Sequence, residues 1–321
     1  MSTLNTRLVS PPFSARSTLR HLWQTNKPLA LTALFSLGLL AFTLLGLWLD
    51  PRTLAGEPLW LKPTKFAVSA IFYSLSFLWL ISHIEGHGRV IRAVSWVTAV
   101  ALFTELVLIA FQATRGVRSH FNNATPFDGA IFSTMGFMIT LLWLASMVAL
   151  IFLIRQRFEN GAWGLALKLA LGVGIIGAGL GFLMTSPNEA QLIHAQATGE
   201  MPEAGGHFVG LPDGEGGKLP VVGWSTEAGD LRIGHFIGMH AMQVLPLIGA
   251  FIVAQNQQLN ERKQRQLVWI AGAGYLGVVI LVTWQALRGE ALVNPSLLTL
   301  AAWGVLLTAV FWSAAAVVRP R

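Results

Sequence analysis

The run P-L-A-L-T-A-L-F-S-L-G-L-L-A-F-T-L-L-G-L-W-L spans residues 28–49 and contains no charged side chain. A helix needs roughly 20 mainly apolar residues to cross the hydrocarbon core of a bilayer, so this run is long enough. Seven more such runs follow along the chain, at residues 64–84, 93–114, 128–154, 163–185, 232–254, 267–287 and 296–318. Because a chain in lipid must satisfy its backbone polar groups internally, we expect an all-α integral membrane protein with eight transmembrane helices.

The composition agrees with this expectation and excludes several other classes of protein. Hydrophobic residues make up 54% of the chain, charged residues make up 12%, and the mean hydropathy is +0.59. A soluble domain carries about 25% charged residues. The absence of cysteine excludes disulfides and thiolate metal sites. The net charge of +7 is spread over short loops, whereas a nucleic-acid surface would gather it on one soluble face, so we expect membrane lipids and no nucleic acid as partners.

Basic residues gather on one side of the expected membrane. If the N-terminal side of the first helix is the inside, the inside segments hold thirteen Lys and Arg residues against three acids. The outside segments hold eight against eleven. The positive-inside rule then predicts that both termini are cytoplasmic, in a bacterial inner membrane. Segment 1–27 separates apolar from basic side chains over residues 16–23, which favours a short helix on the inner leaflet.

Two six-residue stretches repeat far apart in the chain. F-Q-A-T-R-G at 111–116 matches W-Q-A-L-R-G at 284–289, with an offset of 173. T-L-A-G-E at 53–57 matches T-E-A-G-D at 226–230 with the same offset, and L-G-L-W-L-D-P at 45–51 resembles the stretch at 180–187 with an offset near 135. These matches predict a tandem duplication, with repeats at 28–154 and 163–318. The change of offset places an insertion within 188–225 of the second repeat.

Parallel repeats usually pack around a pseudo-two-fold axis along the membrane normal, with the functional site at their interface. Equivalent residues are then expected to approach each other at the outer face, in the pairs Glu57 with Asp230, Lys62 with His235, Gln112 with Gln285, and Arg115 with Arg288. A simpler account of the repeated words is that Gly caps each helix and Arg complements its dipole. Both accounts stay open for the two arginines.

Six membrane-adjacent cations lie on the outer side, where such residues are normally depleted: Lys62, Lys65, Arg115, Arg118, Arg232 and Arg288. They require counter-charges. One interpretation is an anionic ligand, bound by Lys62, Lys65, Arg115, Arg118, Arg288, Gln112 and Gln285 in one cavity. The alternative is local pairing with Glu57, Asp128, Asp230 and Glu290.

Glu105 is the one acid deep within an expected span. It lies nine residues from the outer end of 93–114, or about 13 Å into the membrane. Such residues are rare unless they are paired or functional, so Glu105 is a candidate catalytic or proton-carrying residue. His240 lies at a similar depth in 232–254, which suggests a pair with Glu105. The alternatives are an ion pair of Glu105 with Lys65 and a structural role for His240.

Three histidines of the outer half, His120, His235 and His240, are candidate metal ligands. His235 and His240 are five residues apart, which is about 140° around a regular helix, so they cannot chelate one ion from one helix. Nearby methionines would suit copper or a haem iron. The Gly-rich loop 188–225 joins the expected helices 163–185 and 232–254. Loops of this length often form lids over a site.

The stretches W-L-K-P-T-K-F, R-G-V-R-S-H-F-N and H-F-I-G-M-H-A-M-Q resemble those of a family of bacterial multi-pass membrane proteins, and the resemblance implies no activity. The plan of four plus four helices is similar to haem A synthase. That family places axial histidines on helices 2, 4, 6 and 8, whereas helices 4 and 8 here contain none. The likeness therefore implies only how the eight helices pack, and it implies neither haem ligation nor an activity.

Two functions from different classes fit these residues. The first is a haem- or metal-binding redox protein, a membrane oxidoreductase that uses quinol, with haem b or copper as cofactor and Glu105 as proton carrier. The second is a small transporter or ligand-binding sensor for an anionic solute, with Glu105 as the proton-coupling residue. An absorbance spectrum with metal analysis would separate them.

Overall fold

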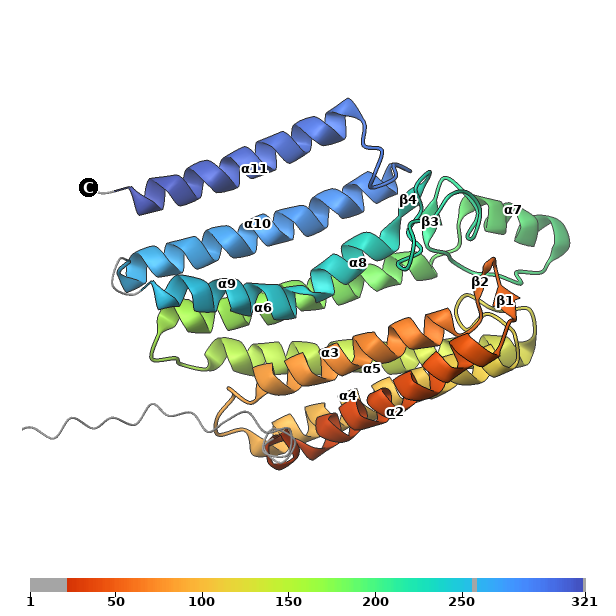
Figure 1. Cartoon of the computed structure of the whole chain (residues 1–321), viewed down its shortest axis with the longest axis horizontal. Helices are drawn as coiled ribbons and strands as arrows, with labels where there is room; N and C mark the ends of the chain where they lie inside the picture. The colour runs from red at the N-terminus through yellow and green to blue at the C-terminus, as the bar shows by residue number, and fades with distance from the viewer. Residues whose placement is uncertain (1–21, 256–258, 320–321) are drawn as a thin grey trace, which may run out of the picture.

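The computed structural model describes residues 22–255 and 259–319 as an all-helical bundle (Figure 1). Seven helices are long and apolar enough to cross a membrane, and a bent pair makes an eighth span if it crosses as one. The expected all-helical architecture is thus confirmed for these residues, with seven or eight candidate spans. Most of the expected interfacial helix at 16–23 lies outside the described residues. In chain order the bundle helices are α2 (Lys27–Leu49), α3 (Leu61–Ile81), α4 (Gly88–Thr114), α5 (Pro126–Arg155), α6 (Gly161–Gly179), α8 (Leu231–Met239), α9 (Ala241–Ala254), α10 (Glu261–Leu287) and α11 (Leu297–Val318).

Local sequence explains where these helices begin and end. Asn26, Asn160 and Ser296 each accept a hydrogen bond from the backbone N–H three residues on, which satisfies one of the free donors of the first turn. Gly116 and Gly289 follow α4 and α10 with φ of +72° and +76°. A residue without Cβ adopts this conformation at little cost, so the chain turns away at both points.

One end of the bundle carries all the short strands and an extra helix. There β1 (Thr53–Leu54) pairs with β2 (Glu57–Pro58), and β3 (Phe208–Val209) pairs with β4 (Gly229–Asp230), both antiparallel. The 3-10 helix η1 (Leu180–Thr185) extends α6, and α7 (Glu189–Thr198) follows it. We call residues 186–230 the lid and this end of the bundle the lid end. The described chain begins and ends at the opposite end, the terminal end (Figure 1).

The lid is fastened to the loops of the first half of the chain. Asn122 and Glu203 form an isolated β-bridge, and Arg118 Nη1 lies 2.7 Å from a carboxylate oxygen of Glu203. Lys218 Nζ donates to the carbonyl of Ala55 at 3.3 Å. The inserted segment 188–225 is therefore a structured cover in contact with the first half.

The two halves of the bundle share one order of packing. In the first, α2 packs on α3 and α4, and α4 packs on α5; in the second, α6 packs on α8, α9 and α10, and α10 packs on α11. The halves meet where α5 packs on α6 and α3 packs on α9. A strict two-fold axis would also place α11 against α2, but these helices lie on opposite sides of the bundle (Figure 1). The expected pseudo-two-fold arrangement is thus not followed by the fourth helix of each half.

The span at 231–254 is bent, and glycine lets it approach α6. Helices α8 and α9 meet at His240 with an angle of 45°. A Cβ placed on Gly177 of α6 would lie 2.3 Å from the carbonyl carbon of Gly238. Because both residues lack side chains, the two backbones touch, as small residues permit in membrane helices.

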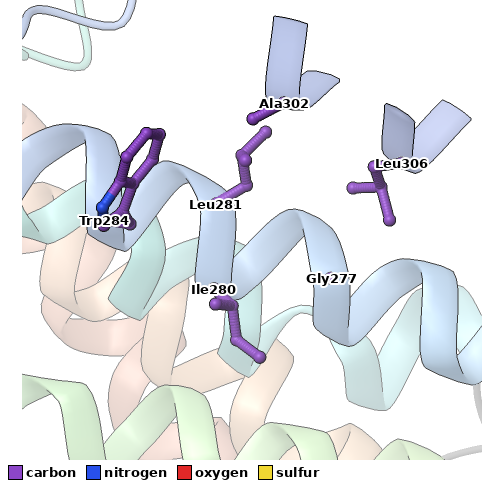
Figure 2. Close-up of a pocket in the computed structure, with 6 residues that line it drawn as sticks. All are labelled: Gly277, Ile280, Leu281, Trp284, Ala302 and Leu306. Carbon is purple, nitrogen blue, oxygen red and sulfur yellow. The ribbon is translucent and has the colours of Figure 1, made fainter. Parts of the chain in front are cut away.

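A shallow groove of about 290 Å³ lies between α10 and α11 (Figure 2). Its lining is apolar, from Gly277, Ile280, Leu281, Trp284, Ala302 and Leu306. The most hydrophobic part of α11 buries none of its residues within the bundle. This face has the character of a lipid-facing surface.

Candidate functional site

Glu105 is buried on α4 and pairs with a loop residue. Its side chain is 5% exposed, and Oε1 lies 3.2 Å from Nε2 of His120. The loop after Gly116 folds back against the bundle and brings His120 to Glu105. The partner of Glu105 therefore comes from the loop after its own helix and not from another helix. The expected partner, His240, is instead exposed at the α8–α9 junction and bonds to Gln243. The alternative partner, Lys65, lies 3.7 Å from Glu57.

The surroundings of His120 fix its charge and its tautomer. Burial, and then the positive charge of Lys62, lower its pKa from the ordinary 6.5 to about 4, against the opposing effect of Glu105. The ring is therefore neutral at neutral pH and carries one N–H. With Glu105 ionised, Nε2 donates to the carboxylate and Nδ1 accepts from the Ser119 hydroxyl, 3.0 Å away. Protonation of Glu105 would reverse the direction of the first bond.

Lys62 and Glu105 both have unused hydrogen-bonding capacity. Oε2 of Glu105 is buried and has no hydrogen-bond partner among the described residues. Nζ of Lys62 lies 5.9 Å from the centre of the Phe66 ring, which itself lies 5.6 Å from the His120 ring. Within the described chain Lys62 forms no hydrogen bond or ion pair, although its charge interacts with Glu105. The Lys62 ammonium and the Glu105 carboxylate thus stand within electrostatic range of each other.

The lid contributes a second histidine–carboxylate pair that the sequence analysis missed. His207 Nδ1 lies 2.7 Å from Asp213 Oδ2, and Oδ1 of Asp213 accepts from the backbone N–H groups of His207 and Phe208. Burial lowers the pKa of His207. Burial acts to raise the pKa of Asp213, but the hydrogen bond and charge of the His207 side chain, with two backbone N–H groups, lower it to about 2. The ring of His207 lies 5.1 Å from that of Phe121, next to His120. The lid therefore brings an ordered imidazole to the same region.

The three candidate metal ligands lie in different places. His235 points its Nδ1 at the carbonyl of Gly177, 2.9 Å away, while His120 contacts Glu105 and His240 contacts Gln243. The bend at His240 turns it away from His235. In residues 22–255 and 259–319, no three His, Asp or Glu side chains gather in a way that could hold a metal ion. The three histidines are therefore not brought together in the described chain.

The predicted anion clamp is resolved into separate local pairs. Arg115 bonds to Asp128, Arg118 to Glu203, Lys65 to Glu57, Arg232 to Asp230, and Arg288 to Glu290. Arg115 also lies over the rings of Phe111 and Phe127, and Arg288 over that of Trp284. These contacts are local because each acid is close in sequence or on an adjoining loop. The convergence of Arg115, Arg118 and Arg288 on one cavity is therefore not observed.

Gln112 and Gln285 hold the chain reversals rather than a ligand. Gln112 Nε2 donates to Asp128 and approaches the carbonyl of Arg118, while Gln285 Nε2 donates to the carbonyl of Ala291, which is 173 residues beyond Arg118. Backbone bonds Val117 to Gln112 and Glu290 to Gln285 repeat at the same offset. Each glutamine is buried, and its side-chain amide reaches a backbone carbonyl in the loop that follows its own helix. The two similar sequence stretches, 111–116 and 284–289, therefore form turns with the same hydrogen bonds.

Acidification is expected to destabilise the protein through His120. Because its pKa is about 4 in the folded chain and 6.5 ordinarily, the unfolded state binds more protons between these values. The stabilisation is fully present above about pH 6.5 and is lost as the pH falls toward about 4, with a size on the order of 3 kcal/mol. Thermal unfolding in detergent should show a steeper loss for wild type than for His120→Gln, which can still donate to Glu105. Equal slopes would show that His120 is accessible to water.

No family model, curated protein or solved structure matches this chain. Its function is therefore inferred from the side chains of the site themselves. Those side chains are Glu105 and His120 from the first half, Lys62 at the start of α3, and His207 with Asp213 from the lid.

Proposed function

We propose that this protein binds a small anionic solute beneath the lid and couples that binding to protonation of Glu105, as a transporter or a ligand-binding sensor does. The observation that carries the proposal is the pair of unused groups, the Lys62 ammonium and Oε2 of Glu105. A buried polar atom without a partner costs free energy unless a ligand, a proton or water satisfies it. An anionic group on Lys62 with a donor toward Glu105 would satisfy both.

Protonation of Glu105 would favour binding of an anion. With Glu105 ionised, the Lys62 charge is partly compensated by the carboxylate. A proton on Glu105 removes that compensation and leaves Lys62 to attract the solute, because opposite charges interact strongly in a low-dielectric site. Neutral His120, bonded to both Glu105 and Ser119, would transmit the change by exchanging its donor and acceptor roles. Proton and solute are then bound together.

The membrane orientation and the duplication belong to this proposal. The matching hydrogen bonds after Gly116 and Gly289 support two parallel repeats. The excess of basic residues at the terminal end supports a cytoplasmic position for both termini. The lid then faces the periplasm or the extracellular side of a bacterial inner membrane, and the site opens outward.

A redox function with haem b or copper and quinol is the second candidate, because the described residues bring no three His, Asp or Glu side chains together. The same experiment addresses both functions. Purified protein in nanodiscs is first tested for a Soret band and for stoichiometric metal, which would favour the redox function. Unfolding temperature is then measured with a panel of small carboxylates, phosphate and amino acids between about pH 5 and about pH 8.

We expect at least one anion of the panel to stabilise the wild-type protein more at low pH. Lys62→Gln should weaken that anion by 10–100-fold, since hydrogen bonds to charged groups are worth about 1.5–3 kcal/mol. Glu105→Gln should bind it without the pH dependence. Lys218→Gln, a lid cation bonded to the carbonyl of Ala55, is the matched control and should keep both. If Lys62→Gln binds the anion as tightly as the wild-type protein, the proposed anion site at Lys62 is wrong.

A further inference from the structure

The buried face of α4 carries a column of polar side chains. Ser95, Thr98, Glu105 and Gln112 are each at most 3% exposed. Spacings of three and seven residues put them along one face of the helix. Ser95 accepts a hydrogen bond from Asn26 at the terminal end, 2.6 Å away. The column therefore runs from the terminal end past Glu105 to the lid end.

Five buried side-chain oxygens have no partner among the described residues. Two of them, Oε1 of Gln264 and Oε1 of Gln285, lie at separate points of α10. The other three, Oε2 of Glu105, Oγ1 of Thr98 and Oγ of Ser74, lie on the neighbouring helices α3 and α4. Helices α3 and α4 pack together. Buried polar atoms are almost always paired with protein or ordered water, so three unpaired oxygens in one region indicate that water enters it.

These groups lie at successive depths along the axis of the bundle. At a rise of 1.5 Å per residue, Glu105 lies about 13 Å below the lid end of α4, Ser74 about 20 Å below that of α3, and Thr98 about 24 Å below that of α4. The lid ends of these helices are level, because Arg52 donates to the carbonyl of Thr114, and Trp60 and Arg52 both bond to Asp50. Along the bundle axis, successive groups therefore differ in height by about 4–7 Å.

The second half lacks the column although it keeps the turns. At the offset of 173, Ser95, Thr98 and Glu105 correspond to Val268, Ala271 and Val278. On α2, the buried Thr32 and Ser36 correspond at the offset of 135 to the buried Leu167 and Leu171. Of these counterparts Val268, Leu167 and Leu171 are buried, while Ala271 and Val278 are partly exposed. The polar column of the first half is not needed for the fold.

We propose that this column is a hydrated proton path that joins Glu105 to the terminal end of the bundle. The inference rests on the proposed function, in which Glu105 takes up and releases a proton. Each step passes a proton from one water or hydroxyl oxygen to the next as another leaves, so no group is oxidised or reduced. Solute then enters from the lid end and the proton from the opposite end, so solute binding depends on the pH at the terminal end.

Single cysteines test whether water reaches the column, since the wild-type chain has none. Ser95→Cys and Thr98→Cys are compared in nanodiscs with Val268→Cys and Ala271→Cys. A thiol reacts as its thiolate, which forms only where water is present. A small charged methanethiosulfonate should label the first pair at least tenfold faster. Equal labelling of the two pairs, with all variants folded, would overturn the path.

Infrared spectroscopy separates a failure of the path from a failure of the proposed function. A carboxylic-acid band that disappears in Glu105→Gln reports the proton on Glu105. Its hydrogen–deuterium exchange should slow at least tenfold in Thr98→Val and stay unchanged in Thr283→Val, whose hydroxyl is bonded to its own helix in the second half. Unchanged exchange in Thr98→Val refutes the path alone. No such band between about pH 4 and about pH 8 refutes the proton-carrying role itself.

Discussion

Gly177→Val is expected to abolish the folded state or to lower its unfolding free energy by about 3 kcal/mol or more, at the upper end of overpacking effects. At this position even one carbon is too many, because the added Cβ would lie 2.3 Å from the carbonyl carbon of Gly238. That neighbour is backbone and cannot rotate away. Helices α6 and α8 would have to separate, which would also displace the Gly177 carbonyl from His235.

Two other glycines supply matched controls for this prediction. A Cβ on Gly136 of α5 or on Gly38 of α2 would meet nothing within 4 Å. Alanine at these sites should be neutral or should stabilise by about 0.5–1 kcal/mol, because glycine costs entropy inside a helix. Unfolding in detergent and the yield of monodisperse protein measure all variants. A normally folded Gly177→Val protein would show that α6 and α8 do not cross where the structure has them.

The spans were predictable because each is a long apolar run between polar ends. Predicted runs 28–49 and 296–318 differ by one residue at their starts from Lys27–Leu49 and Leu297–Val318. The run at 64–84 was placed three residues late, because the helix begins before the lysines of L-K-P-T-K. The bend at His240 was not predicted, since apolar composition continues through it. Hydrophobicity alone records where a helix is apolar and not where it turns.

Of the residues of the site, only the buried Glu105 was predictable from the sequence. Glu105 stands out because a carboxylate within an apolar run must be compensated. Its partner His120 comes from a loop that folds back, and the lid pair His207–Asp213 joins from a distant insertion, so no periodic spacing in the sequence links them. The carboxylate partners of five outer cations were not predictable as a set, because the sequence shows charges without showing which carboxylates lie nearest to them.

Asp230→Asn should cost about 3–5 kcal/mol of stability, the range found when one partner of a buried ion pair is removed. Asp230 is fully buried and lies at the junction of lid and α8. Its carboxylate accepts from Nε and Nη2 of Arg232, from the backbone N–H of Arg232, and from the backbone N–H of Ser225 in the lid. Asparagine keeps the shape but leaves the Arg232 cation uncompensated, and the Arg232 side chain is only 17% exposed.

Asp50→Asn is the matched control, because the same geometry occurs there in water. Asp50 accepts from Nε, Nη2 and the backbone N–H of Arg52, and the Arg52 guanidinium holds the pKa of Asp50 well below its usual range. The Arg52 side chain is 52% exposed, so solvent can replace the lost charge and only a small loss is expected. Arg232→Met combined with Asp230→Asn should recover part of the loss, since no cation is then left buried. If Asp230→Asn and Asp50→Asn unfold alike, burial does not control these pairs and the lid is not held closed by Asp230.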